Sequence, residues 1–133
     1  MIKRIIFLGL VVLGFAAFVN LGFGQEITVN GGNQTMNITT GTPSTEPLAV
    51  LNASCTLTYK KQNVVSKITA GTSCPGQRFS LKVLATSVTK GVAAPEVTLT
   101  NGMLSTDFIT NIPKTGAATG TCTLQYTAWA TYA

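Results

Sequence analysis

Alternation of apolar and polar residues is the strongest regular pattern along the chain. Within residues 49–59 every odd position is apolar, while the even positions from Asn52 to Thr58 carry Asn, Ser or Thr. Residues 121–132 alternate in the same way, with Trp129 on the face that otherwise carries Thr and Gln. Such alternation predicts two strands, each with one buried and one solvated face. It also places Trp129 on a solvated face.

Shorter stretches of strand-like residues fill the rest of the chain, and Gly, Pro and Asn separate them at short intervals. The segment from Asn30 to Asn33 is predicted to be a tight turn that joins the first two strands as a hairpin. About 7–9 short strands without a helical stripe predict an all-β fold, an antiparallel Ig-like β-sandwich. A closed barrel is the alternative that this pattern does not separate. Besides the two strands above, strands are expected at 26–30, 34–40, 64–70, 79–85, 97–99 and 104–110.

The first 24 residues have the pattern of a secretory signal peptide. Lys3 and Arg4 precede an apolar run over residues 5–19, and small residues at Gly22 and Gly24 form a cleavage site. We therefore expect a signal-peptide helix that is removed on export. An uncleaved N-terminal anchor is the alternative, although a membrane-spanning helix needs about 20 apolar residues.

Three parts of the chain follow from this division. Residues 1–24 are the signal peptide, residues 25–46 form an N-terminal hairpin or extension with a linker, and residues 47–133 form the β-sandwich domain. The linker lies at 41–47, where two prolines occur among Thr, Ser and Gly. Thr makes up 22 of the 109 residues after position 24, and Thr suits the solvated face of a sheet.

Composition argues against an enzyme and against a nucleic-acid partner. The net charge of +5 falls to +3 without the signal peptide, and the remaining basic residues are scattered rather than clustered as phosphate binding requires. The chain has no histidine, the commonest general base and metal ligand. Its carboxylates are isolated in sequence, so we expect no catalytic residues, no cofactor and no metal. The carboxylates after the signal peptide are Glu26, Glu46, Glu96 and Asp107.

Three cysteines enter an oxidising compartment if the chain is exported. If strand 49–59 turns at residues 60–63 and runs back, Cys74 returns to the end of the strand where Cys55 lies. We therefore expect a Cys55–Cys74 disulfide, with a Cys55–Cys122 pair as the alternative. In the first case Cys122 is a spare thiol without a histidine to activate it.

Two pentamers, CTLTY at 55–59 and CTLQY at 122–126, are close copies, which we interpret as two core strands with similar packing demands rather than as a repeat. With the alternating stretch 121–133 they give the chain a resemblance to bacterial surface-fibre subunits, namely chaperone–usher pilins and spore-coat-U-like proteins. Tyr132 matches the penultimate aromatic residue of such pilins, whereas the three cysteines depart from their usual pair. The resemblance implies an exported fibre subunit.

The sequence thus favours a secreted, non-enzymatic structural or assembly module of the cell surface or extracellular matrix, extracellular or periplasmic in location. Self-association by strand addition is expected to use residues 25–40, where Ile27 and Val29, then Met36 and Ile38, are spaced two apart. Folding back in the same chain is the alternative for this segment. The alternative function is an extracellular module that binds a glycan or another ligand, with Trp129 as the contact, and a glycan or a surface protein is the expected partner. No membrane partner is expected after cleavage.

Overall fold

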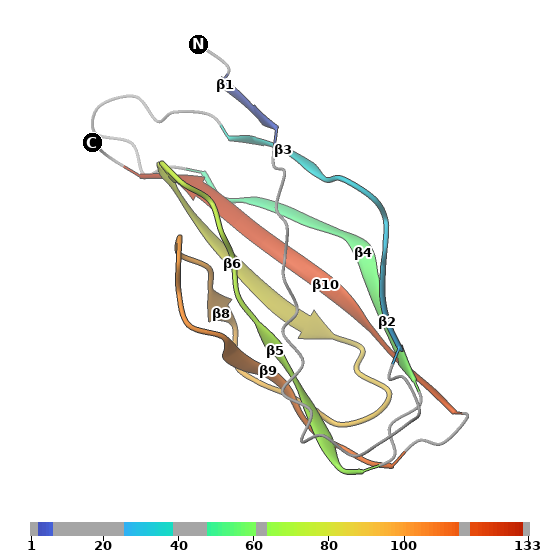
Figure 1. The fold of residues 1–133 in the computed structure, drawn as a ribbon. Coiled ribbons are helices and arrows are strands. Elements are labelled where there is room, and N and C mark those ends of the chain that lie inside the picture. The colour runs from blue at the N-terminus through green and yellow to red at the C-terminus, as the bar shows by residue number, and fades with distance from the viewer. Residues whose placement is uncertain (1–2, 7–25, 39–47, 61–63, 115–117, 132–133) are drawn as a thin grey trace.

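The structure, a computed structural model, describes residues 3–6, 26–38, 48–60, 64–114 and 118–131 (Figure 1). These residues form strands and connecting loops, with no helix among them. Of the expected signal peptide only residues 3–6 are described, as a strand, and its residues 1–2 and 7–24, the linker 41–47 and Tyr132 lie outside the described residues. The strands are β1 Lys3–Ile6, β2 Glu26–Asn30, β3 Thr35–Ile38, β4 Val50–Lys60, β5 Ser66–Ala70, β6 Phe79–Thr86, β7 Val92–Ala93, β8 Val97–Thr98, β9 Thr106–Ile112 and β10 Thr119–Ala130.

Two antiparallel sheets make up the body of the protein. The larger sheet has the strand order β2-β4-β10-β6-β8 and the smaller sheet β5-β9-β7, while β1 and β3 pair separately. From β4 to β10, each successive strand lies in the other sheet, so every connection crosses between the sheets. Figure 1 shows β10 between β4 and β6. The predicted all-β, antiparallel two-sheet architecture is confirmed.

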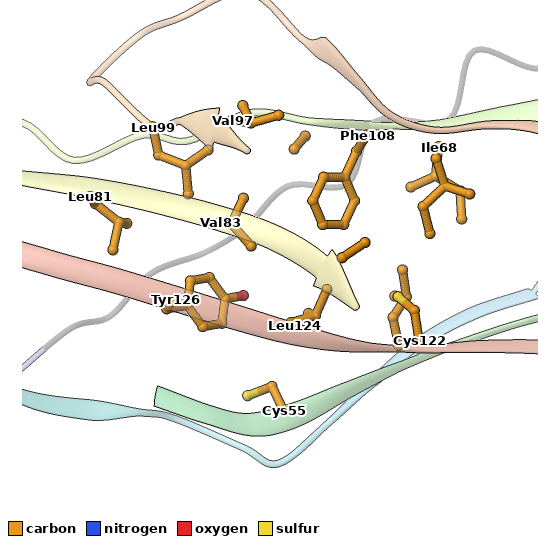
Figure 2. Packing of buried hydrophobic residues seen from close by; sticks show 14 of the residues in the cluster. Cys55, Ile68, Leu81, Val83, Val97, Leu99, Phe108, Cys122, Leu124 and Tyr126 are labelled. Carbon is orange, nitrogen blue, oxygen red and sulfur yellow. The ribbon is translucent and has the colours of Figure 1, made fainter. Parts of the chain in front are cut away.

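The core lies between the sheets, because alternate side chains of each strand point toward the facing sheet. Every odd residue of β6 is buried and every even residue is only partly buried, as strand periodicity requires. Ile68 and Phe108 of the smaller sheet face Val83 and Leu124 of the larger one (Figure 2). All four side chains are at most 2% exposed, so both sheets contribute to one apolar layer.

A β-bulge in β4 overturns part of the predicted alternation. Leu124 pairs with Cys55 but Tyr126 pairs with Asn52, so two residues of β4, Ala53 and Ser54, oppose one residue of β10. The extra residue reverses which face each side chain occupies. Cys55, Leu57 and Tyr59 are buried as expected, whereas Leu51 is 59% exposed.

The first two expected strands form, but they do not make a hairpin with each other. β2 pairs with β4, and β3 pairs with β1. Gly31 lies between them with φ of 121°, and a Cβ there would come within 2.9 Å of Cys55 Sγ. The segment after β2 therefore passes closely over β4 at the bulge instead of turning back on itself.

The two similar pentamers lie side by side. Cys122 pairs with Leu57, Thr123 with Thr56, and Leu124 with Cys55, so the first three residues of each copy oppose those of the other in reverse order. Their Cys and Leu side chains all enter the core. The two similar pentamers therefore occupy equivalent positions on two adjacent core strands.

Candidate functional site

The edge strand β2 is held to the body mainly through its backbone. It pairs with β4 from Glu26 opposite Lys60 to Asn30 opposite Thr56. Ile27 alone in β2 is half-buried, and Val29 is 42% exposed. Glu26 and Lys60 form a 3.1 Å ion pair with nearly half of each side chain exposed, a kind of contact that adds little stability.

The next strand, β3, is anchored far more firmly. Met36 and Ile38 are each 4% exposed and join the core cluster, and β3 lies against β4 and β10. The structure therefore separates the four expected strand-donor residues into two groups. Ile27 and Val29 lie on a thinly packed edge strand, and Met36 and Ile38 enter the core.

Between these strands, a polar cluster at the bulge fixes the chain in place. Gln34 Nε2 donates to the Gly31 carbonyl at 2.6 Å, and Asn52 Nδ2 donates to Gln34 Oε1 at 3.0 Å. The backbone N–H of Ser54, exposed by the bulge, donates to Asn52 Oδ1 at 3.0 Å. Sequence analysis missed this cluster, because its members are brought together only by the bulge that the alternation concealed.

The structure does not show the expected Cys55–Cys74 disulfide: its three cysteines are free thiols. β5 does not return along β4 but crosses to the smaller sheet, and this carries Cys74 away from Cys55. The alternative partner, Cys122, is on the strand next to Cys55 but lies opposite Leu57 rather than opposite Cys55. Figure 2 shows both buried thiols in the core.

Burial makes these thiols poor nucleophiles. Burial raises the pKa of Cys122 to about 11 and also raises that of Cys55 above its ordinary value. The pKa of Tyr126 rises to about 12, first because the ring is buried and then because the two thiols lie near it. A reactive thiol needs a lowered pKa, so this cluster is a packing feature.

Trp129 lies on the outer face of the larger sheet, as its place in the alternation predicts. It is opposite Ser80, and its neighbour Thr127 is opposite Lys82. The Lys82 ammonium lies 5.3 Å from the centre of the indole ring and 3.0 Å from Glu96 Oε2. Sequence analysis missed Lys82 and Glu96 as neighbours of Trp129, although the outward position of Lys82 in strand 79–85 was a signal.

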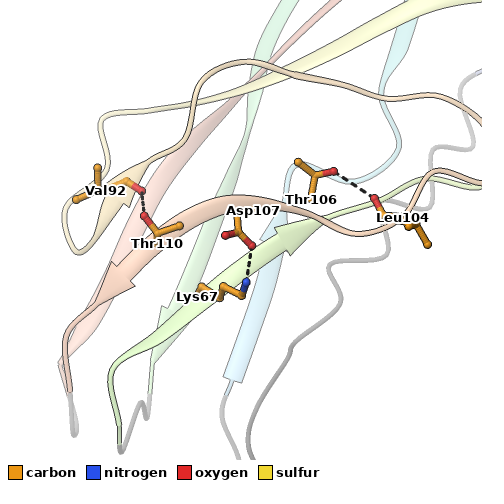
Figure 3. Close-up of polar contacts among 6 residues, drawn as sticks. All are labelled: Lys67, Val92, Leu104, Thr106, Asp107 and Thr110. Atoms are coloured by element: carbon orange, nitrogen blue, oxygen red, sulfur yellow. Dashed lines mark hydrogen bonds and ion pairs between the residues drawn. The ribbon is translucent and has the colours of Figure 1, made fainter.

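The smaller sheet carries a separate polar contact. Lys67 and Asp107 form a 2.7 Å ion pair between β5 and β9, and nearby threonine hydroxyls donate to backbone carbonyls of Leu104 and Val92 (Figure 3). Nearly half of each charged side chain is exposed. The pair aligns two strands and offers no enclosed site.

In comparisons with known proteins, no family model, no curated protein and no solved structure matches the chain. Within the described residues, no group of three or more Cys, Asp or Glu side chains is placed to hold a metal ion. The same residues contain no helix long and apolar enough to cross a membrane. Two features of the molecule therefore remain as candidates for function: the N-terminal strands and the face around Trp129.

Proposed function

We propose that this protein is an exported structural subunit of the cell surface or extracellular matrix, with an Ig-like sandwich that assembles by exchanging its N-terminal strand. One observation carries the proposal. β2 occupies the edge of the larger sheet through ladder bonds, with four of its five side chains exposed. Such a strand gives up little buried apolar surface when it leaves, and the same ladder accepts an identical strand from a second copy.

Cleavage of the signal peptide would free backbone groups that this exchange can use. β1 lies within the proposed signal peptide and pairs with β3 from Lys3 opposite Ile38 to Ile6 opposite Thr35. Removal of residues 1–24 takes β1 away and leaves β3 without a paired strand among the described residues. Both N-terminal strands of the mature chain then present backbone groups that a neighbouring copy can use.

The donor in this proposal is N-terminal because the C-terminal strand is not at an edge. β10 pairs with β4 from Thr119 to Ala128 and with β6 from Thr123 to Ala130, so it lies between two strands over most of its length. Withdrawing β10 would expose Cys122, Leu124, Tyr126 and Ala128, all buried in the core. Exchange of β2 instead leaves the core intact.

Sedimentation of the mature chain tests the proposal. The material is chain recovered from the medium, whose N-terminal residue is expected to be Gln25. It is compared with a variant beginning at Gly32, which lacks β2 but keeps the core residues Met36 and Ile38 of β3, and whose β-structure is checked by circular dichroism. We expect concentration-dependent oligomers from the first and monomers from the second, and a synthetic peptide of residues 25–31 should bind the shortened chain.

Three results would contradict it. A mature chain that stays monomeric over the whole concentration range excludes strand exchange. Equal association of both chains places the interface elsewhere. Secreted material that retains Met1 contradicts cleavage of the signal peptide.

A further inference from the structure

We propose that the outer face of the larger sheet around Trp129 binds a neutral, flat polysaccharide of the β-1,4-linked type. This binding surface consists of Trp129, Thr127, Ser80, Lys82 and Glu96. It lies on the opposite face of the sheet from the core and away from the β4 edge that pairs with β2. The inference therefore does not depend on strand exchange.

Trp129 breaks the chemical pattern of its own strand. The other outward positions of β10 from 121 to 131 are threonine, apart from Gln125. The Trp129 side chain is partly exposed on this outer face, so part of a large apolar ring meets water at a position where the neighbouring residues carry hydroxyls. An indole among hydroxyls offers a stacking surface for the C–H face of a sugar ring, while its neighbours remain polar.

Lys82 and Glu96, which lie beside Trp129, supply hydrogen-bonding groups for a bound sugar. Lys82 lies above one face of the indole and is fixed by its 3.0 Å ion pair with Glu96, with about a third of each charged side chain exposed. Together they present an ammonium donor and a carboxylate acceptor next to the ring. A vicinal pair of sugar hydroxyls can both donate and accept hydrogen bonds, so it matches this arrangement.

The charge and shape of the surface select among ligands. Lys82 and Glu96 neutralise each other, which favours a neutral polyhydroxyl ligand over a strongly acidic or basic one. Trp129 lies just past the end of the β10–β4 pairing, which stops at Ala128, so at this position β10 is flanked by β6 alone, with β8 beyond β6. Thr127 and Trp129 of β10 and Ser80 and Lys82 of β6 share this outward face, so a flat, ribbon-like glycan is expected to lie along the two strands.

Affinity electrophoresis and fluorescence test the proposal on the mature chain. Gels contain hydroxyethylcellulose, with glycogen as the curved, α-linked comparison. Trp129 is the single tryptophan of the chain, so its fluorescence reports this surface directly. We expect hydroxyethylcellulose, but not glycogen, to retard the protein, to shift its emission and to protect it from iodide quenching.

Variants assign the binding to individual side chains. Trp129→Ala should weaken the retardation about tenfold or more with an unchanged thermal midpoint, and Trp129→Tyr should restore part of it. Glu96→Gln should weaken binding and leave the fluorescence of the free protein little changed. Leu104→Ala is the matched control, because Leu104 is 89% exposed and lies outside this surface.

Several results would contradict glycan binding at this surface. Wild-type protein that is neither retarded nor protected from iodide overturns the proposal, as does equal retardation of Trp129→Ala. If Trp129→Ala fails to fold, the iodide measurement on wild-type protein and the Glu96→Gln variant decide. Full retention of binding by Glu96→Gln, or equal binding to glycogen, also contradicts the proposed surface and ligand.

Discussion

At the scale of single residues, the core of this protein contains close contacts that leave no space for a larger side chain. Gly120 lies opposite Tyr59, and a Cβ at Gly120 would overlap the tyrosine ring. Tyr59 is fully buried, and its hydroxyl donates to the Lys90 carbonyl at 2.5 Å. The glycine therefore makes space for the ring, which in turn ties β4 to the loop before β7.

The raised pKa values of the buried thiols predict weaker folding at alkaline pH. An unfolded cysteine loses its proton near its ordinary pKa of 9.0, whereas folded Cys122 keeps its proton up to about 11. The unfolded state thus binds fewer protons in this range, so the free energy of unfolding falls as pH rises from 9 to about 11. Cys122 alone should contribute a loss of roughly 2 kcal/mol.

Urea unfolding at a series of pH values with a reducing agent measures this effect. Cys122→Ala should show a smaller fall between pH 9 and 10, and Tyr126→Phe should differ from wild type only at higher pH, because tyrosine ordinarily ionises near pH 10. An identical pH dependence in wild type and Cys122→Ala would contradict the burial of this thiol.

At the scale of strands, the sequence predicted where strands occur better than how they pair. The alternation identified β6 and β10 with their buried faces, because both strands run without interruption through the core. It failed at Leu51, because a one-residue bulge reverses the faces of a strand without changing its composition. The hairpin at Asn30–Asn33 failed for a related reason: local turn signals do not reveal that β4 is a better partner for β2.

The unequal packing of β2 and β3 predicts unequal effects of substitutions. Ile38→Ala removes a side chain that is 4% exposed in the core, so it should lower the free energy of unfolding by about 2–5 kcal/mol. Val29→Ala is the matched control on β2, where the side chain is 42% exposed and the loss should stay below about 1 kcal/mol. Chemical unfolding of both variants measures the difference, and similar losses would contradict the thin packing of β2.

At the scale of the whole molecule, two sheets are linked by a chain that crosses between them at every step from β4 to β10. The sequence predicted the all-β class from period-two patterns, since both sheets have a buried face. It did not predict the crossing of β5 to the smaller sheet, so the return of the chain along β4, on which the expected Cys55–Cys74 disulfide was based, is wrong. Sheet membership depends on packing between distant strands, such as Ile68 against the core of the larger sheet, and no local pattern encodes it.

The Trp129 surface illustrates the same limit. The outward position of Trp129 followed from β10 alone, but its neighbours Lys82 and Glu96 come from β6 and from the residue before β8. Their meeting depends on strand order, which the sequence did not reveal. A single residue of the surface was therefore predictable, and its chemical setting was not.

Disulfide trapping between two copies tests the central claim, exchange of β2, most directly. Thr28 on β2 lies opposite Thr58 on β4, so Thr28→Cys in one tagged copy and Thr58→Cys in a differently tagged copy can form a cross-strand bond only if β2 passes between chains. Both copies carry Cys74→Ser to remove the partly exposed thiol. The matched control mixes Thr86→Cys and Thr123→Cys copies, a pair of opposed threonines on β6 and β10.

After the two copies are unfolded, refolded together and mildly oxidised, non-reducing gels and mass spectrometry count the mixed disulfides. Strand exchange predicts a mixed dimer from the Thr28→Cys and Thr58→Cys pair well above that from the Thr86→Cys and Thr123→Cys pair. A yield no higher than the control would show that β2 stays with its own chain and would contradict the proposed assembly.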